Sequence, residues 1–230
     1  MPHFLVETDN DGAIRQVLKD GVPYDSGFVL EQHFSVVTTY FKIATRNLAA
    51  LEAAQSQEDR RCFGLQSFIM SMTGLEAFAN TYYHHRANEL ENVAILERIK
   101  QSHGTITRKI VELQEMTGDG LLRDQEHLIE QLFQLSQLRN EIVHPRWQPS
   151  QIAMPGEVWL MIEGLVENRQ SLFEDAVLCR EALNWCLLLV ARVAQSLGHS
   201  SVEGFLFYWT GQYGLSVESV LANLGLPADA

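Results

Sequence analysis

The chain has few basic residues, and this shortage limits what it can bind. Lysine and arginine together number 17, against 29 aspartates and glutamates, so the formal net charge is −12. A surface of this sign repels nucleic acids and acidic membranes at long range. Any role with nucleic acid must therefore depend on a local site and not on a broad basic face.

Cysteine is also scarce. The three cysteines are Cys62, Cys179 and Cys186, and none of them forms a C-x-x-C pair. The last two lie seven residues apart on the apolar face of a predicted helix, so we expect buried, reduced thiols. This usage suits a reducing compartment, and we expect a cytoplasmic protein.

Long hydrophobic runs and cofactor motifs are missing as well. The longest apolar run, residues 183–194, contains Asn184 and Arg192 and is too short to span a bilayer, so no membrane partner is expected. The first nine residues have no basic segment followed by an apolar run, which argues against a signal peptide. No phosphate-binding glycine loop, dinucleotide fingerprint or nucleophile elbow occurs, and we expect no cofactor.

The N-terminal residues predict a β-hairpin. Two short apolar segments, 4–6 and 14–18, flank Asn10-Asp11-Gly12, which is a strong signal for a tight turn. A second turn near Gly21 is expected to lead into helix. Residues 1–24 would then be a β appendage.

Most of the remaining chain has helical periodicity. Apolar residues spaced by three and four predict long amphipathic helices over about 28–54, 65–82, 121–143 and 172–197. A polar stretch, 55–61, is expected to separate the first two helices, and a polar continuation of the second could run to about residue 100. Shorter helices are expected over 106–116, 202–209 and 216–224, while 158–162 could begin a helix or form a short strand.

Four long helices with one apolar face each must bury those faces against one another. We therefore expect an all-α bundle with a helical core over 28–197, short helices over 198–230 and the β-hairpin as an appendage. No internal repeat, low-complexity segment or linker divides the chain, so one domain over 1–230 is the simplest organisation.

The third long helix ends on a charge and a titratable ring. Its apolar stripe continues into Arg139, and a charge on a packing face must be paired or functional because burying it alone is costly. Pro145 ends the helix near His144. Asn140 and His144 share a face, whereas Arg139 and His144 point roughly 140° apart. They converge only if the helix end loosens or a second copy supplies the missing partner.

A purely structural role for these residues stays open. Cations near a helix C-terminus are favoured by the helix dipole by about 0.3–1 kcal/mol, so Arg139 and His144 could simply stabilise the helix end. Glu76 lies one step beside the stripe of the second long helix and could pair with Arg139, or it could be an exposed flank residue. Asn80, one turn further on, is a weaker candidate for the same contact.

The string RNEIVHP at residues 139–145 resembles the signature of the HEPN superfamily (higher eukaryotes and prokaryotes nucleotide-binding). That signature is an arginine, four to six residues and a histidine, often with a polar residue directly after the arginine, as Asn140 is here. Upstream, GLEAFAN at residues 74–80 resembles the helix that many members pack against the motif helix. The resemblance covers about residues 28–197 and implies an all-α bundle.

The resemblance implies a metal-independent endoribonuclease, usually a homodimer with both motifs facing one cleft. His144 would act as general base or general acid, Arg139 would hold the scissile phosphate and Asn140 would orient either one. RNA would be cut to 2′,3′-cyclic phosphate and 5′-hydroxyl ends. Such a chain could be a toxin or defence effector held by an antitoxin or other regulatory partner. The alternative is a non-catalytic module that binds a nucleotide or a protein.

One position departs from part of the family. Some members carry a tyrosine two residues after the histidine, where AMP is attached, but this chain has Arg146 there. Control by that modification is therefore not expected. Arg146 could add a phosphate contact or be an exposed charge at the rim.

Two further groups of residues are weighed against structural roles. His84 and His85 are adjacent, so on a helix they point about 100° apart and do not easily share a metal ion, although Glu89 could join His85. We therefore expect no metal site. Several aromatics could stack on bases, but core packing or a dimer contact is the expectation for them. They are Tyr82, Tyr83, Trp147, Trp159 and the cluster at residues 205–209.

Overall fold

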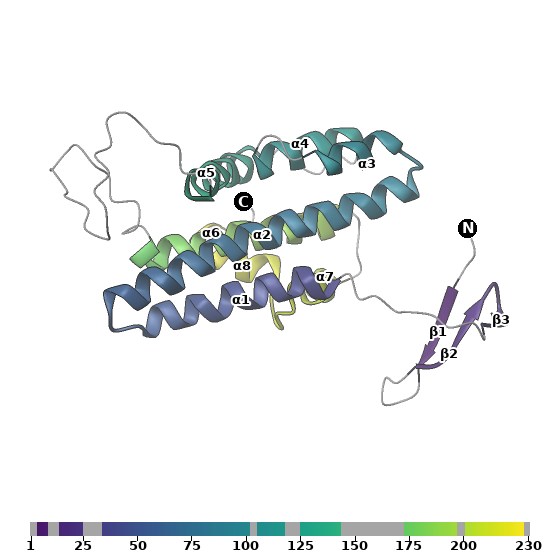
Figure 1. Cartoon of the computed structure of the whole chain (residues 1–230), viewed down its shortest axis with the longest axis horizontal. Helices are drawn as coiled ribbons and strands as arrows, with labels where there is room; N and C mark the ends of the chain where they lie inside the picture. Colours follow the sequence, from purple (N-terminus) through teal and green to yellow (C-terminus); the bar gives the residue numbers. More distant parts are fainter. Residues whose placement is uncertain are drawn as a thin grey trace. The chain divides into compact units, whose positions relative to one another are not determined.

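The computed structural model describes residues 4–8, 14–24, 34–101, 105–117, 125–143, 173–196 and 201–227. The chain divides into two compact units, Met1–Gln32 and His33–Ala230. The described residues form a three-stranded sheet in the first unit and eight helices in the second (Figure 1). The prediction of a mainly helical fold with a small N-terminal β element is confirmed.

The first unit is an antiparallel sheet in the order β1-β2-β3. β1 (Phe4–Thr8) pairs with β2 (Ile14–Lys19), so the predicted hairpin is present, although its turn at residues 9–13 lies outside the described residues. The second turn was predicted over Gly21-Val22-Pro23, but its last two residues form a strand. The chain reverses at Asp20 and Gly21, both with positive φ, and returns as β3 (Val22–Pro23).

The second unit begins with a helical hairpin. α1 (Phe34–Ala53) lies against the first half of α2 (Gln57–Glu89), and residues 28–33 of the predicted first helix lie outside the described residues. The two helices approach closely because Gly74 faces the ring of Phe41, and the buried Ser67 hydroxyl donates to the Ala44 carbonyl at 3.0 Å.

The predicted break between the first two helices is present, but it is shorter than the polar stretch 55–61, because α1 ends at Ala53 and α2 already begins at Gln57. Ser56 caps the helix by accepting from the Asp59 amide, and acidic residues in the first turn suit the positive end of the helix dipole. The apolar stripe predicted over 65–82 is buried at Phe68, Met72, Leu75, Ala79 and Tyr82, and its first residue, Leu65, is exposed.

α2 does not continue to residue 100. It ends at Glu89, and Glu91 takes a positive φ of 52°. Asn92 then caps a separate helix, α3 (Val93–Lys100), by accepting from two backbone amides. The polar character of this stretch therefore marks a break between helices.

α3, α4 (Ile106–Thr117) and α5 (Glu126–Val143) form a layer over the second half of α2, seen at the top of Figure 1. α4 matches the predicted short helix, and α5 matches the described part of the predicted third long helix. A buried hydrogen bond of 2.7 Å between Thr107 and Ser136 joins α4 to α5. The segment 144–172, which includes the undecided residues 158–162, lies outside the described residues.

α6 (Ala176–Ser196) is the central helix of this unit. Every residue from 182 to 191 is buried, because α6 contacts α1, α2, α5, α7 and α8. A helix that is apolar on all sides belongs in the interior. The two predicted closing helices are present as α7 (Val202–Thr210) and α8 (Val217–Asn223), both packed on α6.

No helix of the described residues is long and apolar enough to cross a membrane. All three cysteines are free thiols, with Cys62 exposed and Cys179 and Cys186 buried as predicted. Burial, and secondarily the nearby charge of Asp175, raises the pKa of Cys179 to about 12. Burial raises the pKa of Cys186 further still.

Gly64 sets the approach of α2 to the segment before α6. A Cβ atom on this glycine would lie 1.8 Å from the Phe173 carbonyl oxygen, and the Cys179 thiol donates to the Gly64 carbonyl. The obstacle is backbone, so it cannot yield as a side chain would.

We expect Gly64→Ala to lower the free energy of unfolding by about 3 kcal/mol or more, at the upper end of the range for overpacked cores. Gln66→Ala, two residues away and exposed, serves as the control and should change it by no more than about 0.5 kcal/mol. Urea denaturation followed by circular dichroism measures both. Equal stability of the two variants would contradict the close approach.

The thiols should react very unequally with a thiol reagent at pH 8. Only the exposed Cys62 should be modified in the native chain, since the raised pKa values keep Cys179 and Cys186 protonated and burial shields them. All three should react in denaturant. Rapid native modification of more than one thiol per chain would show that the core around α6 is open.

Candidate functional site

Two polar residues of α2 face α5. Glu76 and Asn80 lie one turn apart beside the buried residues Leu75 and Ala79, so both occupy the edge of the packing face and are partly exposed. At this position a long side chain can reach the neighbouring helix and still touch solvent. The flank position predicted for Glu76 is therefore where the structure places it.

Arg139 extends the packing face of α5. It follows the buried residues Leu132 and Leu135, and only 20% of its side chain is exposed. Its Nη2 lies 3.5 Å from the Glu76 carboxylate, and its Nη1 donates to the Asn140 side-chain oxygen at 3.1 Å. Of the two alternatives for Glu76, the pair with Arg139 is the one present.

Where α2 meets α5, some of the buried polar atoms form no hydrogen bond with the described residues. The Nε of Arg139 and the side-chain oxygen of Asn80 are both buried, and neither has a hydrogen-bond partner among the described residues. A buried donor or acceptor without a partner costs roughly 1–3 kcal/mol. The pair of Arg139 with Glu76 is also longer than the roughly 2.7–2.9 Å of a strong charge-assisted bond.

A second cation acts on Glu76 from α4. Lys109 is buried and donates to the Ile99 carbonyl at 2.7 Å. Burial lowers the pKa of Lys109, the nearby charge of Glu76 raises it and that of Arg98 lowers it, with burial the largest effect. Glu76 therefore interacts with cations of both α4 and α5.

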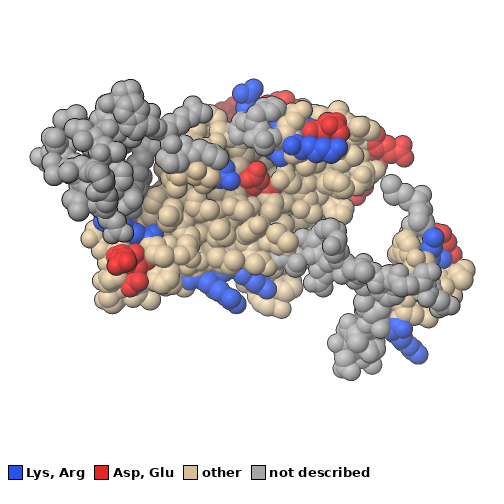
Figure 2. All heavy atoms as spheres, in the orientation of Figure 1, with Lys and Arg blue, Asp and Glu red and all other residues tan. Residues whose placement is uncertain are grey.

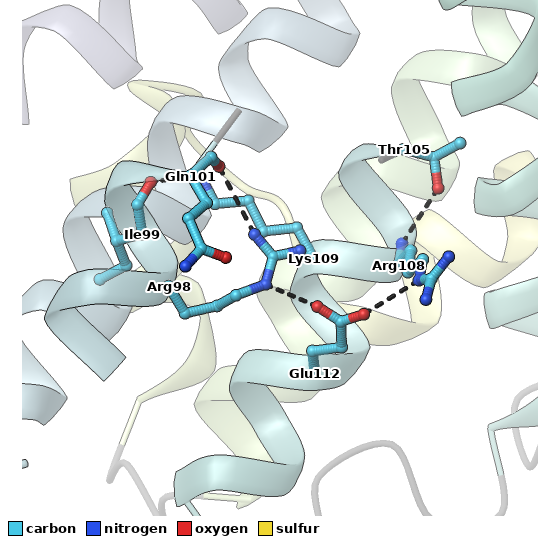
Figure 3. A network of polar contacts seen from close by, with 7 residues as sticks. All are labelled: Arg98, Ile99, Gln101, Thr105, Arg108, Lys109 and Glu112. Carbon is cyan, nitrogen blue, oxygen red and sulfur yellow. Dashed lines mark hydrogen bonds and ion pairs between the residues drawn. The ribbon is translucent and has the colours of Figure 1, made fainter. Parts of the chain in front are cut away.

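Lys109 belongs to a polar network that joins the end of α3 to α4 (Figure 3). Glu112 accepts from Arg98 at 2.5 Å and from Arg108 at 2.9 Å, and these hydrogen bonds hold the pKa of its carboxyl below the usual range. Arg98 also reaches the Gln101 carbonyl, next to the carbonyl that Lys109 contacts. The network joins the end of α3 to α4 and so positions Lys109.

Sequence reasoning missed Lys109, although a signal was present. Lys109 stands three residues after Ile106 and four before Leu113, both buried, so a cation interrupts the apolar stripe of α4 as Arg139 interrupts that of α5. A search for charges on packing faces would have found both residues.

The predicted site is described only in part. The structure brings Arg139, Asn140 and Glu76 into contact, and Asn80 lies one turn from Glu76. The described part of α5 reaches Val143, and His144 and Arg146 lie outside the described residues. The proposed roles of these two residues stay predictions.

The other candidates have plainer positions. His84 and His85 are exposed on α2, and His84 lies 3.2 Å from the Asn88 amide nitrogen. Within the described ranges, no group of three or more histidine, cysteine or acidic side chains could hold a metal ion.

The aromatic candidates separate into two groups. Tyr82 and Tyr83 are buried, with the Tyr83 hydroxyl donating to Gln114 at 3.0 Å, and Trp209 is buried against Phe78. Core packing is confirmed for these three. Phe207 and Tyr208 are exposed, and Trp147 and Trp159 lie outside the described residues.

Comparison of the chain with models of protein families, with curated proteins and with solved structures finds no match in any of the three.

The ion pair of Arg139 with Glu76 should be measurable in a double-mutant cycle. We expect Glu76→Ala and Arg139→Ala to be coupled by about 0.5–1 kcal/mol, because Arg139 is mostly buried and Glu76 only partly exposed. The exposed pair of Glu97 with Lys100, at 2.8 Å, is the matched control and should couple more weakly. Urea denaturation of the four variants of each cycle gives both values. Coupling no larger than in the control would mean that the partial burial of the pair does not strengthen it.

Proposed function

We propose that this chain is a HEPN-like endoribonuclease that cuts RNA without a metal ion. The observation that carries the proposal is the position of Arg139: a guanidinium on the packing face of α5, held by Glu76 and Asn140 near the end of the helix. Charged groups placed in partly buried positions with incomplete hydrogen bonding are common at sites of function. The described part of α5 reaches Val143, the residue before His144 in the sequence.

In the proposed reaction, His144 removes the proton from a ribose 2′-hydroxyl, and the 2′-oxygen attacks the adjacent phosphorus. The bond from phosphorus to the 5′-oxygen breaks, and the leaving oxygen takes up a proton from a general acid. The products are a 2′,3′-cyclic phosphate and a 5′-hydroxyl. Arg139 would neutralise the charge that grows on the phosphate oxygens. DNA lacks the nucleophile and would not be cut.

The long contact between Arg139 and Glu76 suits this role. A carboxylate that holds a guanidinium at 3.5 Å orients it without using its full hydrogen-bonding capacity. A phosphate can then bind Arg139 while Glu76 keeps its electrostatic interaction with Lys109. We propose a homodimer in which two copies of the motif share one cleft, because on an ideal helix Arg139 and His144 would point roughly 140° apart.

The same contact favours a second candidate, a non-catalytic module that binds a nucleotide or a protein. Glu76 neutralises Arg139 in a chain whose net charge is already −12, and both effects weaken the attraction for RNA. This candidate keeps the fold and the motif residues but predicts binding without turnover.

Cleavage of an RNA pool by purified protein in EDTA tests the proposal. Wild type should cut RNA and leave 2′,3′-cyclic phosphate ends, while His144→Ala should lower the rate by roughly 100-fold or more, as expected for loss of general acid–base catalysis. Arg139→Ala should be similarly impaired. His84→Ala, which removes an exposed histidine elsewhere, is the matched control and should be as active as wild type.

Two results would refute the ribonuclease. One is intact RNA after long incubation with wild type, and the other is equal cleavage by wild type and His144→Ala. Binding of a nucleotide without any cleavage would favour the second candidate. A solution mass of one chain would contradict the shared cleft.

A further inference from the structure

An exposed pair of stacked aromatic rings lies at the end of α7. Phe207 and Tyr213 have ring centroids 4.1 Å apart and planes inclined by 28°. Tyr213 is 84% exposed and Phe207 is 38% exposed, so the pair is not part of the core. Two flat, solvent-facing rings are an unusual use of aromatic surface in a soluble protein, because their burial would otherwise stabilise the fold.

The segment that carries these rings is fixed to α1. Gly211 ends α7 with a φ of +69°, and its amide donates to the Phe207 carbonyl at 2.7 Å. The Gln212 side chain donates to the Thr45 hydroxyl at 2.8 Å, and Thr38 donates to carbonyls at the end of α7. The rings are therefore held in place before any partner binds, which lowers the entropy lost on binding.

Two basic side chains stand on α1 beside this turn. Lys42 and Arg46 are one helical turn apart and exposed, and a Cβ atom on Gly211 would lie 2.4 Å from the Lys42 side chain. Over the described ranges, neither forms an ion pair, whereas Arg61 and Arg180 pair with carboxylates. Figure 2 shows basic side chains over α1 with uncharged surface between them.

We propose that Phe207, Tyr213, Lys42 and Arg46 form a binding surface for single-stranded nucleic acid. A base would stack on the exposed face of Tyr213, and the two cations would contact neighbouring phosphates. Every base has a flat face, so this surface would bind without strong sequence preference. The proposal does not depend on catalysis by His144, and the surface lies on helices other than those of the candidate site.

The chemistry of this surface favours nucleic acid over a protein partner. The turn at Gly211 and Gln212 lies against threonine and lysine side chains of α1, whereas the centre of a protein interface is apolar and depleted of charge. Two cations that form no ion pair with the described residues also favour an anionic partner, in a chain of net charge −12. Glu203 lies one turn before Phe207 on α7, so an acidic residue stands next to this surface.

Binding of a labelled oligothymidylate of about 12 nucleotides, followed by fluorescence anisotropy, tests this surface. DNA is chosen because it lacks the 2′-hydroxyl, so the proposed cleavage cannot consume the probe. Wild type should bind it, and Tyr213→Ala should bind roughly tenfold more weakly. The ring is exposed, so circular dichroism should show an unchanged fold.

The electrostatic part has its own signature. In the double variant Lys42→Glu, Arg46→Glu, affinity should fall, and the slope of log affinity against log salt should shrink by about 1.4, or about 0.7 for each lost phosphate contact. Lys100→Glu makes the same kind of charge change at an exposed lysine of α3 and should leave that slope unchanged.

Three outcomes would overturn the proposal. Wild type could fail to bind the oligonucleotide at low salt, Tyr213→Ala could bind as tightly as wild type, or Lys100→Glu could weaken binding as much as the double variant. Sedimentation tests the alternative that a second copy covers the rings, in which case Tyr213→Ala would dissociate a dimer and leave oligonucleotide binding unchanged. Loss of cleavage with binding retained would refute the ribonuclease alone.

Discussion

The burial of α6 is the constraint on which the helical unit depends. Residues 182–191 are apolar on every side except for Asn184, whose side chain donates to the Arg180 carbonyl within the same helix. Such a helix is stable in water only when other helices surround it, and α1, α2, α5, α7 and α8 do so. Because α2 and α5 both pack on α6, they also lie against each other, and this brings Glu76 and Arg139 into contact.

The same packing explains where the charges lie. α3, α4 and α5 cover only the second half of α2. Polar side chains at the edge of this layer are therefore partly buried and need hydrogen-bond partners within the protein. Arg98 has the Glu112 carboxylate as its partner, and Lys109 has the Ile99 carbonyl near the end of α3. Arg139 is less fully hydrogen-bonded, since its Nε has no partner among the described residues. A cation that is held but incompletely bonded retains donors for an anionic ligand.

Apolar periodicity predicted the long helices and the position of Arg139 on a packing face, and the turn signal at Asn10-Asp11-Gly12 predicted the hairpin. Its errors arose at polar residues near helix ends: the second helix begins at Gln57, before the first apolar residue of its stripe, and the possible continuation of that helix to about residue 100 overlooked the break at Asn92. Periodicity also cannot identify a central helix, because burial on all sides depends on how many neighbours pack around it. The contact of Arg139 with Glu76 could be suspected from the two stripes, but choosing it over an exposed Glu76 required three-dimensional packing.

The pairing of Arg139 bears directly on how such a chain would bind RNA. An arginine already neutralised by Glu76 supplies little long-range attraction, and the net charge of −12 opposes approach of a polyanion. A ribonuclease built on this site would therefore need affinity from elsewhere on its surface. Stacking on Tyr213 gives binding energy that does not depend on net charge, and Lys42 and Arg46 confine the phosphate contacts to one turn of α1. If both proposals hold, binding and cleavage are carried by separate helices, so that Arg139 is left to stabilise the transition state and not to capture the substrate.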